Sequence, residues 1–335
     1  MKVAFVAPSL HGGGAERAAV TVLNGLDPAF YTRTLYLFRR EGPYLDEVSP
    51  SVRILAEHGA GRLGRIVRLV GFLREWRPDV VVSFLSYASV FTAVALARVG
   101  ARFVINQQTP VTAFLADADY RWRRPARRRA FEWVARRVYP RAAVVATSRG
   151  VRDDLVERFG ARPDAVATIP NPVDLGRIAR ASAEPLDLDL PPGEPVIVSA
   201  GRLAEAKNWP LFVEALARLA RTHRFTALVL GQGEREAEIR ERVHAAGLGE
   251  RVRLLGFQAN PWRFMARADA FLLTSRYEGF GNVLVEAMAC GVPVVATASP
   301  GTRDIVEDGA TGLLVDRHEP DAVAAALARL LGDPV

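Results

Sequence analysis

Cysteine, long apolar runs and lysine are all scarce in this sequence. The single cysteine, Cys290, excludes an internal disulfide and a zinc site built from several cysteines, and it fits a reducing compartment. No apolar run reaches the ~18 residues that a membrane-spanning helix needs. The opening apolar run, residues 1–8, is too short for a signal peptide and is interpreted as a buried first strand. We therefore expect a cytoplasmic protein whose contact with the inner face of the cell membrane, where it occurs, is peripheral.

Lysine occurs at two positions only. Of the 44 basic residues, Lys2 and Lys207 are lysine and all the others are arginine. In such a sequence, a lysine deep in the chain indicates a position where a compact ammonium group is favoured over a guanidinium. Chance survival on a solvated surface is the competing interpretation of Lys207 taken alone. The formal net charge of +7 and the pI of about 10.0 indicate an anionic partner, such as nucleic acid, an acidic membrane surface or a phosphate-rich substrate.

The length and the apolar pattern predict two α/β domains. A chain of 335 residues exceeds the roughly 250–300 residues that one core supports. Strand-length apolar runs alternate with helical stretches through residues 1–172, as in βαβ units with parallel sheets. A linker is expected over 173–195, where prolines and acids gather, and the βαβ pattern restarts over 196–335. Two Rossmann-like domains facing an interdomain cleft are expected, with ligands bound at the carboxyl ends of the strands.

A glycine-rich turn follows the first expected strand. His11 and the glycines Gly12–Gly14 precede a helical stretch, so backbone amides are expected at a helix N-terminus, which suits an anion. This feature alone is not specific, because glycine turns after a first strand are common. The turn lacks the second half of a G-x-G-x-x-G fingerprint and the Gly-Lys-Ser/Thr ending of a P-loop. The sequence therefore argues against an NTPase.

The second half of the chain offers two cations close to a strand end. The apolar run 196–200 is followed by Gly201 and Arg202, and Lys207 comes five residues after the arginine. Two fixed cations match the charge of a diphosphate and can stabilise it as a leaving group without a metal. Ordinary solvated charge is the alternative. The place beside a strand end and the scarcity of lysine favour the functional interpretation.

The most specific signal lies in the segment 275–293. A glycine-rich turn there enters a helix, so the amides around Gly281–Leu284 suit an anion or sugar hydroxyls. Glu278 precedes the turn and Glu286 lies in the helix, with seven residues between them. Since one carboxylate accepts two hydroxyl hydrogens, such residues suit the adjacent hydroxyls of a sugar or a ribose. The alternatives are a loop acid for Glu278 and a helix-surface acid for Glu286.

This segment resembles the glutamate-x7-glutamate motif of the GT4 family of retaining glycosyltransferases, which have the GT-B fold. Four further segments also match the family and occur along the chain in the family's order. They are Gly12–Gly14, Asn171–Asp174, Gly201–Arg202 with Lys207–Asn208, and Asp308–Gly309 with Gly312–Val315. The resemblance implies an enzyme of the hexosyltransferase type that moves a sugar from a nucleotide-diphosphate sugar to an acceptor hydroxyl. It implies a UDP-sugar as donor, no metal and no cofactor. A role in cell envelope polysaccharide, lipid-linked glycan or glycolipid synthesis is expected.

The resemblance also implies roles for single residues. Arg202 and Lys207 would bind the donor diphosphate, with the amides of Gly13 and Gly14 helping from the other domain. Glu286 would bind the nucleotide ribose and Glu278 the transferred sugar, so that Arg202, Lys207 and Glu278 are the expected catalytic residues. The other expected donor-binding positions are Gly279, Phe280, Gly281, Asn282, Val283 and Leu284. Front-face attack is implied, in which the leaving phosphate oxygen takes the proton of the acceptor.

The chain departs from the family at one place. Members often carry a histidine after the fourth or fifth strand, near the transferred sugar. Here the segment 104–110 has Gln107 and Gln108 and no histidine, and an amide side chain donates hydrogen bonds without titrating. His11 is a nearby histidine, interpreted as incidental. The choice of donor, the choice of acceptor, or activity itself can therefore differ from the family pattern.

Two Asp-x-Asp strings are present, Asp117 with Asp119 and Asp187 with Asp189. In GT-A enzymes such a pair binds a divalent metal. Here one string falls in a long loop and the other in the expected linker, and the strand pattern is not that of a GT-A fold. Both are interpreted as solvated loop acids, and no metal site is expected.

An arginine-rich stretch, Tyr120–Arg141, holds nine arginines interleaved with five aromatic residues. The pattern suits an interfacial segment on anionic lipid, and it also suits nucleic acid phosphates. A solvated helix whose aromatic residues pack inward is an equal alternative. Peripheral membrane contact is favoured because related enzymes act on lipid-linked acceptors, and no nucleic acid is expected. A nucleotide-sugar epimerase of similar fold and a non-enzymatic sugar-nucleotide or nucleic-acid binder are the rival functions.

Overall fold

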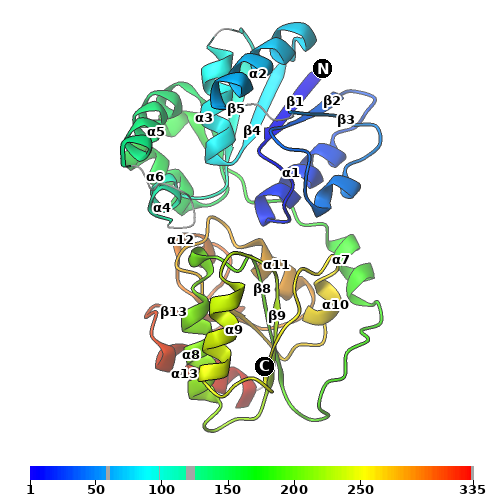
Figure 1. Cartoon of the computed structure of the whole chain (residues 1–335), viewed down its shortest axis with the longest axis vertical. Coiled ribbons are helices and arrows are strands. Elements are labelled where there is room, and N and C mark those ends of the chain that lie inside the picture. The colour runs from blue at the N-terminus through cyan, green and yellow to red at the C-terminus, as the bar shows by residue number, and fades with distance from the viewer. Residues whose placement is uncertain (58–60, 98, 118–124, 333–335) are drawn as a thin grey trace. The chain divides into compact units, whose positions relative to one another are not determined.

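The computed structural model describes residues 1–57, 61–97, 99–117 and 125–332 (Figure 1). The chain divides into two compact units, with the boundary between Pro172 and Val173, and Asp117 is grouped with the second unit. Asp119 and the start of the arginine-rich stretch, residues 120–124, lie outside the described residues. The expected linker over 173–195 belongs to the second unit and contains a helix.

The first unit is built on a parallel sheet of seven strands in the order β3-β2-β1-β4-β5-β6-β7. The strands are β1 (Lys2–Ala7), β2 (Thr32–Leu37), β3 (Arg53–Ala56), β4 (Val80–Phe84), β5 (Arg102–Gln107), β6 (Ala143–Ala146) and β7 (Val166–Thr168). The helices are α1 (Gly14–Gly25), α2 (Arg62–Trp76), α3 (Ser86–Leu96), α4 (Val111–Ala116), α5 (Pro125–Val138) and α6 (Arg149–Phe159). The strand order reverses between β1 and β4, and a ligand of such a sheet binds at this reversal, beyond the carboxyl ends of the strands.

The second unit is built on a parallel sheet of six strands in the order β10-β9-β8-β11-β12-β13. The strands are β8 (Val196–Ala200), β9 (Thr226–Leu230), β10 (Val252–Leu254), β11 (Ala270–Leu273), β12 (Val294–Thr297) and β13 (Gly312–Val315). The helices are α7 (Leu175–Ser182), α8 (Trp209–Leu219), α9 (Glu236–Ala245), α10 (Trp262–Met265), α11 (Asn282–Ala289), α12 (Pro300–Arg303) and α13 (Pro320–Gly332). The parallel sheets predicted from the apolar pattern are therefore confirmed for both halves.

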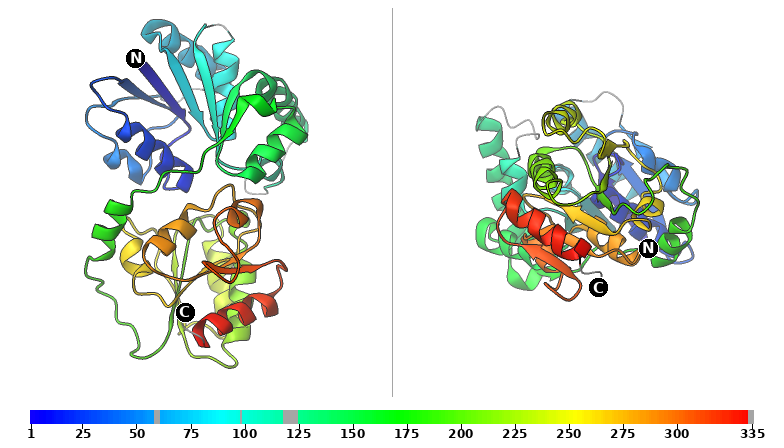
Figure 2. Two further views of the ribbon diagram at one scale, coloured as in Figure 1. Left: turned by 180° about the vertical axis from the view of Figure 1, so that it is seen from behind. Right: turned by 90° about the horizontal axis from the view of Figure 1, so that it is seen from below.

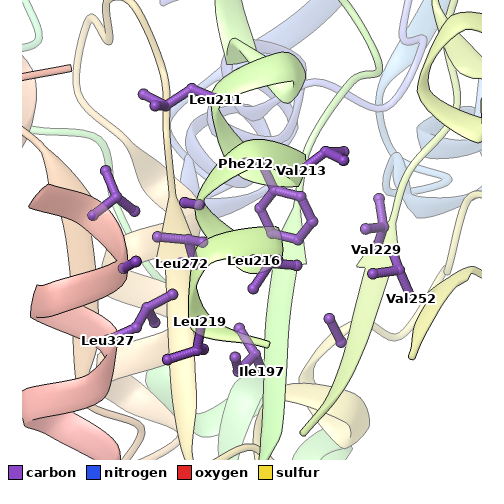
Figure 3. Packing of buried hydrophobic residues seen from close by; sticks show 14 of the residues in the cluster. Ile197, Leu211, Phe212, Val213, Leu216, Leu219, Val229, Val252, Leu272 and Leu327 are labelled. Atoms are coloured by element: carbon purple, nitrogen blue, oxygen red, sulfur yellow. The ribbon is translucent and has the colours of Figure 1, made fainter. Parts of the chain in front are cut away.

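The core of the second unit has two layers, one on each face of its sheet. Alternate strand residues point to opposite faces, so Ile197 packs with α8, α9 and α13 while Val198 packs with α7, α10 and α11. Phe212 of α8 lies between the strands and the neighbouring helices, as Figure 3 shows. The final helix, α13, packs against α8 (Figure 2). Two covered faces explain why β8 and β9 are buried along their whole length.

Candidate functional site

The loop after β8 is fixed by a close approach of two backbones. A Cβ atom on Gly231 would lie 1.9 Å from the carbonyl oxygen of Gly201, so only glycine permits this packing. The amide of Gly201 donates to Leu230 at 2.9 Å, and the amide of Leu203 donates to Gln232 at 3.0 Å. The loop that carries Arg202 and Lys207 therefore leaves the sheet along one defined path.

Further bonds tie this loop to the loop after β11. The Thr274 hydroxyl donates to the carbonyl oxygen of Lys207 at 3.1 Å, and the amide of Arg276 donates to Ala206 at 2.8 Å. The Glu205 carboxylate pairs with the Arg276 guanidinium at 3.1 Å and also with Arg235. Glu205 could not be singled out from its sequence neighbours, because its two partners lie far along the chain.

Lys207 and Glu278 are in direct contact. The Lys207 ammonium donates to Glu278 Oε1 over 2.5 Å, and the Ser275 hydroxyl donates to the same oxygen over 2.6 Å. The two charged side chains are only 19% and 12% exposed, so water screens the pair less than it screens a surface salt bridge. Two residues predicted to act on the donor, 71 positions apart, thus meet at the carboxyl ends of β8 and β11.

Arg202 is held by its main chain. Its carbonyl oxygen accepts a hydrogen bond of 3.1 Å from the indole nitrogen of the buried Trp209, and its side chain is exposed. An anionic ligand can therefore reach the Arg202 side chain from solvent, in the same loop that carries Lys207. Trp209 was not singled out from the sequence, so its role in holding Arg202 was missed.

The turn before α11 requires glycine at its last position. Gly281 has φ of +102° and stands at the N-cap of the helix, a conformation that other residues adopt at a cost. The amide of Leu284 donates to the Gly281 carbonyl at 2.9 Å, and the Leu284 side chain is fully buried. Gly301 of α12 packs beside the turn, since a Cβ there would lie 2.6 Å from the carbonyl oxygen of Glu278. Gly301 was missed, although the Ser299 capping box marks its helix.

Glu286 is buried, which makes its interpretation as a helix-surface acid wrong. Its side chain lies in α11, and Oε2 accepts a hydrogen bond of 3.2 Å from the indole nitrogen of Trp262. One helical turn later, burial and the nearby Glu286 charge raise the pKa of the Cys290 thiol to about 11. Trp262 was missed from the sequence. The signal that could have indicated it is its place as an aromatic residue directly after Asn260 and Pro261.

The glycine turn of the first unit is held from the side. Gly13 is the N-cap of α1 and has an extended backbone, with Gly14 as the first helical residue. The Tyr44 hydroxyl donates to the carbonyl oxygen of Gly12 at 3.0 Å, and the Arg17 guanidinium donates to the same hydroxyl at 2.8 Å. Tyr44 and Arg17 thus fix the glycines that the sequence singled out.

The two glutamines at the end of β5 have different surroundings. Gln107 is fully buried, donates to the Ser86 hydroxyl at 2.7 Å and accepts from the Tyr139 hydroxyl at 2.8 Å. Gln108 exchanges two amide hydrogen bonds with Asn171, of 2.9 and 2.7 Å. Gln107 is therefore a core residue. Gln108 ties the end of β5 to the last residues of the first unit.

The remaining singled-out residues are His11 and the aspartates of the two Asp-x-Asp strings. His11 pairs with Glu41 at 2.9 Å on an exposed surface. Asp117 is buried, so its interpretation as a solvated acid is wrong, whereas Asp187 and Asp189 are exposed. No group of three or more His, Cys, Asp or Glu side chains among the described residues is placed to hold a metal ion.

The described part of the arginine-rich stretch forms α5. Arg127, Arg128 and Arg129 are exposed, and Trp133 is 57% exposed with the Arg137 guanidinium 3.5 Å from its ring centre. Phe131 is buried in the core. Aromatic residues thus point both inward and outward. In the part of the chain that the structure describes, no helix has the length and apolar character needed to cross a bilayer.

Solved structures share this fold. HepE from Anabaena, in complex with UDP and glucose, superimposes with a TM-score of 0.80 at 23% identity, covering 99% of this chain and 90% of HepE. Sucrose-phosphate synthase from Thermosynechococcus elongatus superimposes with a TM-score of 0.84 at 22% identity, covering 100% and 90% of the two chains. Two units with parallel, helix-covered sheets of this kind define the GT-B class, and the predicted fold is confirmed.

Family comparisons cover almost the whole sequence. Residues 12–177 match the family described as Glycosyltransferase Family 4, and residues 183–334 match the family described as Glycosyl transferases group 1. The chain therefore belongs to the GT4-type glycosyltransferases that these two descriptions cover, as the motifs around Glu278 and Glu286 predicted.

Curated relatives include enzymes of lipid-linked and cell-surface glycans. The N-acetylgalactosamine-N,N'-diacetylbacillosaminyl-diphospho-undecaprenol 4-alpha-N-acetylgalactosaminyltransferase of Campylobacter jejuni is 34% identical over 198 residues, 58% of this chain and 53% of the relative. The lipopolysaccharide core biosynthesis glycosyltransferase LpsE of Rhizobium meliloti is 33% identical over 168 residues, covering 50% and 48%. The matches span about half the length of these relatives.

Proposed function

We propose that the protein is a retaining glycosyltransferase that moves a sugar from a nucleotide-diphosphate sugar, with UDP-sugar as the favoured donor, to an acceptor hydroxyl. The contact of Lys207 with Glu278 beside the turn at Gly281 carries this proposal, because it places a cation, a carboxylate and a helix N-terminus together. The UDP and glucose named for the HepE complex support the donor class. The undecaprenol-linked and lipopolysaccharide substrates named for the relatives support a lipid-linked or cell-surface glycan as acceptor.

The proposed reaction is a substitution at the anomeric carbon of the donor sugar. The acceptor oxygen forms a bond to that carbon while the bond from the carbon to the β-phosphate oxygen breaks, and the nucleoside diphosphate leaves with the electron pair. Arg202 and Lys207 stabilise the negative charge that develops on the leaving group. Glu278 orients the sugar through its hydroxyls, and Glu286 binds the ribose. A leaving phosphate oxygen on the same face takes the acceptor proton, which retains the configuration and requires no side-chain base.

The release of free nucleoside diphosphate tests this function. Ligands are first found by thermal shift with nucleotides and sugar nucleotides, because a ligand that binds the folded state raises the Tm. A transferase releases UDP only when donor and acceptor are both present. An epimerase converts the donor sugar without releasing UDP, and a non-enzymatic binder shows the thermal shift and no reaction. Absence of UDP release with lipid-linked and glycan acceptors alike would contradict the proposal.

We expect the transfer reaction to proceed without a divalent metal. The cations Arg202 and Lys207 supply the charge that a metal supplies elsewhere, so an excess of chelator is expected to change turnover less than twofold. The measurement is the rate of UDP release in EDTA and after addition of Mg²⁺ or Mn²⁺. Loss of turnover in chelator that either metal restores would show that the two side chains do not suffice.

We further propose that α5 binds an anionic membrane surface reversibly. Exposed arginines near such a surface contribute about 1 kcal/mol each, and Trp133 offers an exposed aromatic ring on the same helix. Replacing Arg127, Arg128 and Arg129 with glutamine is expected to weaken binding to anionic vesicles at least tenfold. Affinity for UDP is expected to stay unchanged, because Arg127, Arg128 and Arg129 are not among the residues assigned to the donor. Co-sedimentation with phosphatidylglycerol vesicles at low and high salt measures the effect.

The matched control removes the same charge elsewhere. Arg221, Arg224 and Arg317 are exposed residues of the second unit, and their replacement with glutamine also lowers the net charge by three. This triple variant is expected to bind vesicles almost as the unmodified protein does. An equal loss of vesicle binding in both variants would show that only the overall charge matters. If the unmodified protein stays in the supernatant at low salt, the membrane proposal is wrong. A gel shift that rises with added nucleic acid would favour the rival partner.

A further inference from the structure

Trp262 donates a hydrogen bond to the Glu286 carboxylate, and neighbouring helices hold Trp262 in place. The residue is 3% exposed, and the Arg177 guanidinium lies 5.2 Å from the centre of its ring. Its carbonyl oxygen accepts from the Cys290 thiol, with 3.8 Å between the heavy atoms. Contacts from α7 and α11 therefore fix the short helix α10, on which Trp262 is the first residue.

The hydrogen bond between Trp262 and Glu286 sets the direction of the carboxylate. A glutamate side chain has three rotatable bonds, so an unrestrained carboxylate samples many orientations. The indole nitrogen, 3.2 Å from Oε2, selects one of them. A carboxylate has two oxygens and about four lone-pair directions. A hydrogen bond from the indole N–H is therefore compatible with accepting from two neighbouring hydroxyls.

We infer that Trp262 is a positioning residue for the ribose of the donor. Its indole N–H orients Glu286 so that the carboxylate accepts from the 2′- and 3′-hydroxyls together, and it thereby sets the preference for a ribonucleotide. The inference rests on the proposed function, in which Glu286 binds the ribose. Trp262 acts through Glu286 and is not assigned any contact with the reacting atoms.

Trp262→Phe removes the N–H and keeps an aromatic ring under Arg177. The probes are UDP, 2′-deoxy-UDP and 3′-deoxy-UDP, with affinities measured by titration calorimetry. In the unmodified protein each deoxynucleotide is expected to bind about tenfold more weakly than UDP. In Trp262→Phe the affinity for UDP is expected to fall about tenfold, and the affinities for the deoxynucleotides less than twofold. The discrimination between ribose and deoxyribose is therefore expected to disappear.

Trp209→Phe is the matched control. It also removes the N–H of a buried indole, but that group donates to the carbonyl oxygen of Arg202. Its effect is expected to be equal on UDP and on the deoxynucleotides. In a third protein, Glu286→Gln, the added change Trp262→Phe is expected to cause less than a twofold further loss, because both substitutions interrupt one interaction.

If Trp262→Phe lowers the affinity for all three nucleotides equally, Trp262 has a structural role only, and the inference is overturned. Unchanged affinity and discrimination would overturn it as well. If the unmodified protein binds none of UDP, GDP and ADP, the proposed function fails first, and this outcome is recognised before any variant is made.

A second measurement covers the case in which Trp262→Phe does not fold. The protein has five tryptophans, and single Trp→Phe variants of the other four assign the indole N–H resonance of Trp262 by elimination. This resonance is expected to shift clearly when UDP binds and far less when 2′,3′-dideoxy-UDP binds. An equal shift with both nucleotides, or none with either bound, contradicts the inference.

Discussion

Alanine at Lys207 or at Arg202 is expected to lower the turnover of sugar transfer by roughly thirty- to thousand-fold. Each substitution removes a fixed cation whose stabilisation of a leaving diphosphate corresponds to about 2–4 kcal/mol, as for other positioned electrostatic groups. The Lys207 ammonium already lies in a largely water-excluded place beside Glu278, where its charge acts strongly on a neighbouring group. The rate of UDP release at saturating donor measures the effect.

The identity of the cation at position 207 is testable separately. Lys207→Arg keeps the charge but replaces a compact ammonium with a planar fork that is wider than the contact with Glu278 and Ser275 accommodates. We expect a loss of turnover of at least tenfold. Lys2→Ala is the control, because Lys2 lies on the first strand and donates to a backbone carbonyl of Trp76. Wild-type turnover in Lys207→Ala would remove the diphosphate assignment.

The fold was predictable where elements are long or fully buried. The expected strand over the apolar run 196–200 coincides with β8, which is covered on both faces. The strand β7 and the helix α10, of three and four residues, were missed, because in these segments the apolar residues show no clear period of either kind. These short elements are stabilised by contacts with the rest of their unit, β7 with β6 and α6, and α10 with α7 and α11.

The candidate site was predictable as a set of residues but not as a set of contacts. Scarcity of lysine singled out Lys207, and the spacing of Glu278 and Glu286 singled out the pair of carboxylates. Their partners Ser275 and Trp262 were missed in these roles, because a serine hydroxyl or an indole N–H gains its role from what it faces in space. Sequence spacing sets the neighbours along one helix, whereas β8 and β11 are brought side by side only by the sheet.

Glu278→Gln is expected to lower turnover by about hundred- to thousand-fold while UDP binding is retained or strengthened. The amide keeps the shape of the side chain but accepts hydrogen bonds from sugar hydroxyls less strongly than a carboxylate does. The substitution also removes the negative partner of Lys207. Binding of the diphosphate then no longer has to compete with the Glu278 carboxylate for the ammonium group. Turnover and UDP affinity are therefore expected to move apart. UDP release and titration with UDP measure the two quantities.

This separation distinguishes Glu278 from Lys207, although the two side chains are in contact. Lys207→Ala is expected to weaken UDP binding and turnover together, because the ammonium acts on the diphosphate itself. Ser275→Ala removes only the second donor to Glu278 Oε1, so a smaller loss of turnover, about tenfold, is expected with UDP affinity near that of the unmodified protein. If Glu278→Gln weakened UDP binding as much as Lys207→Ala does, the carboxylate would serve to hold Lys207 in place. Contact with the transferred sugar would then have to be assigned to another residue.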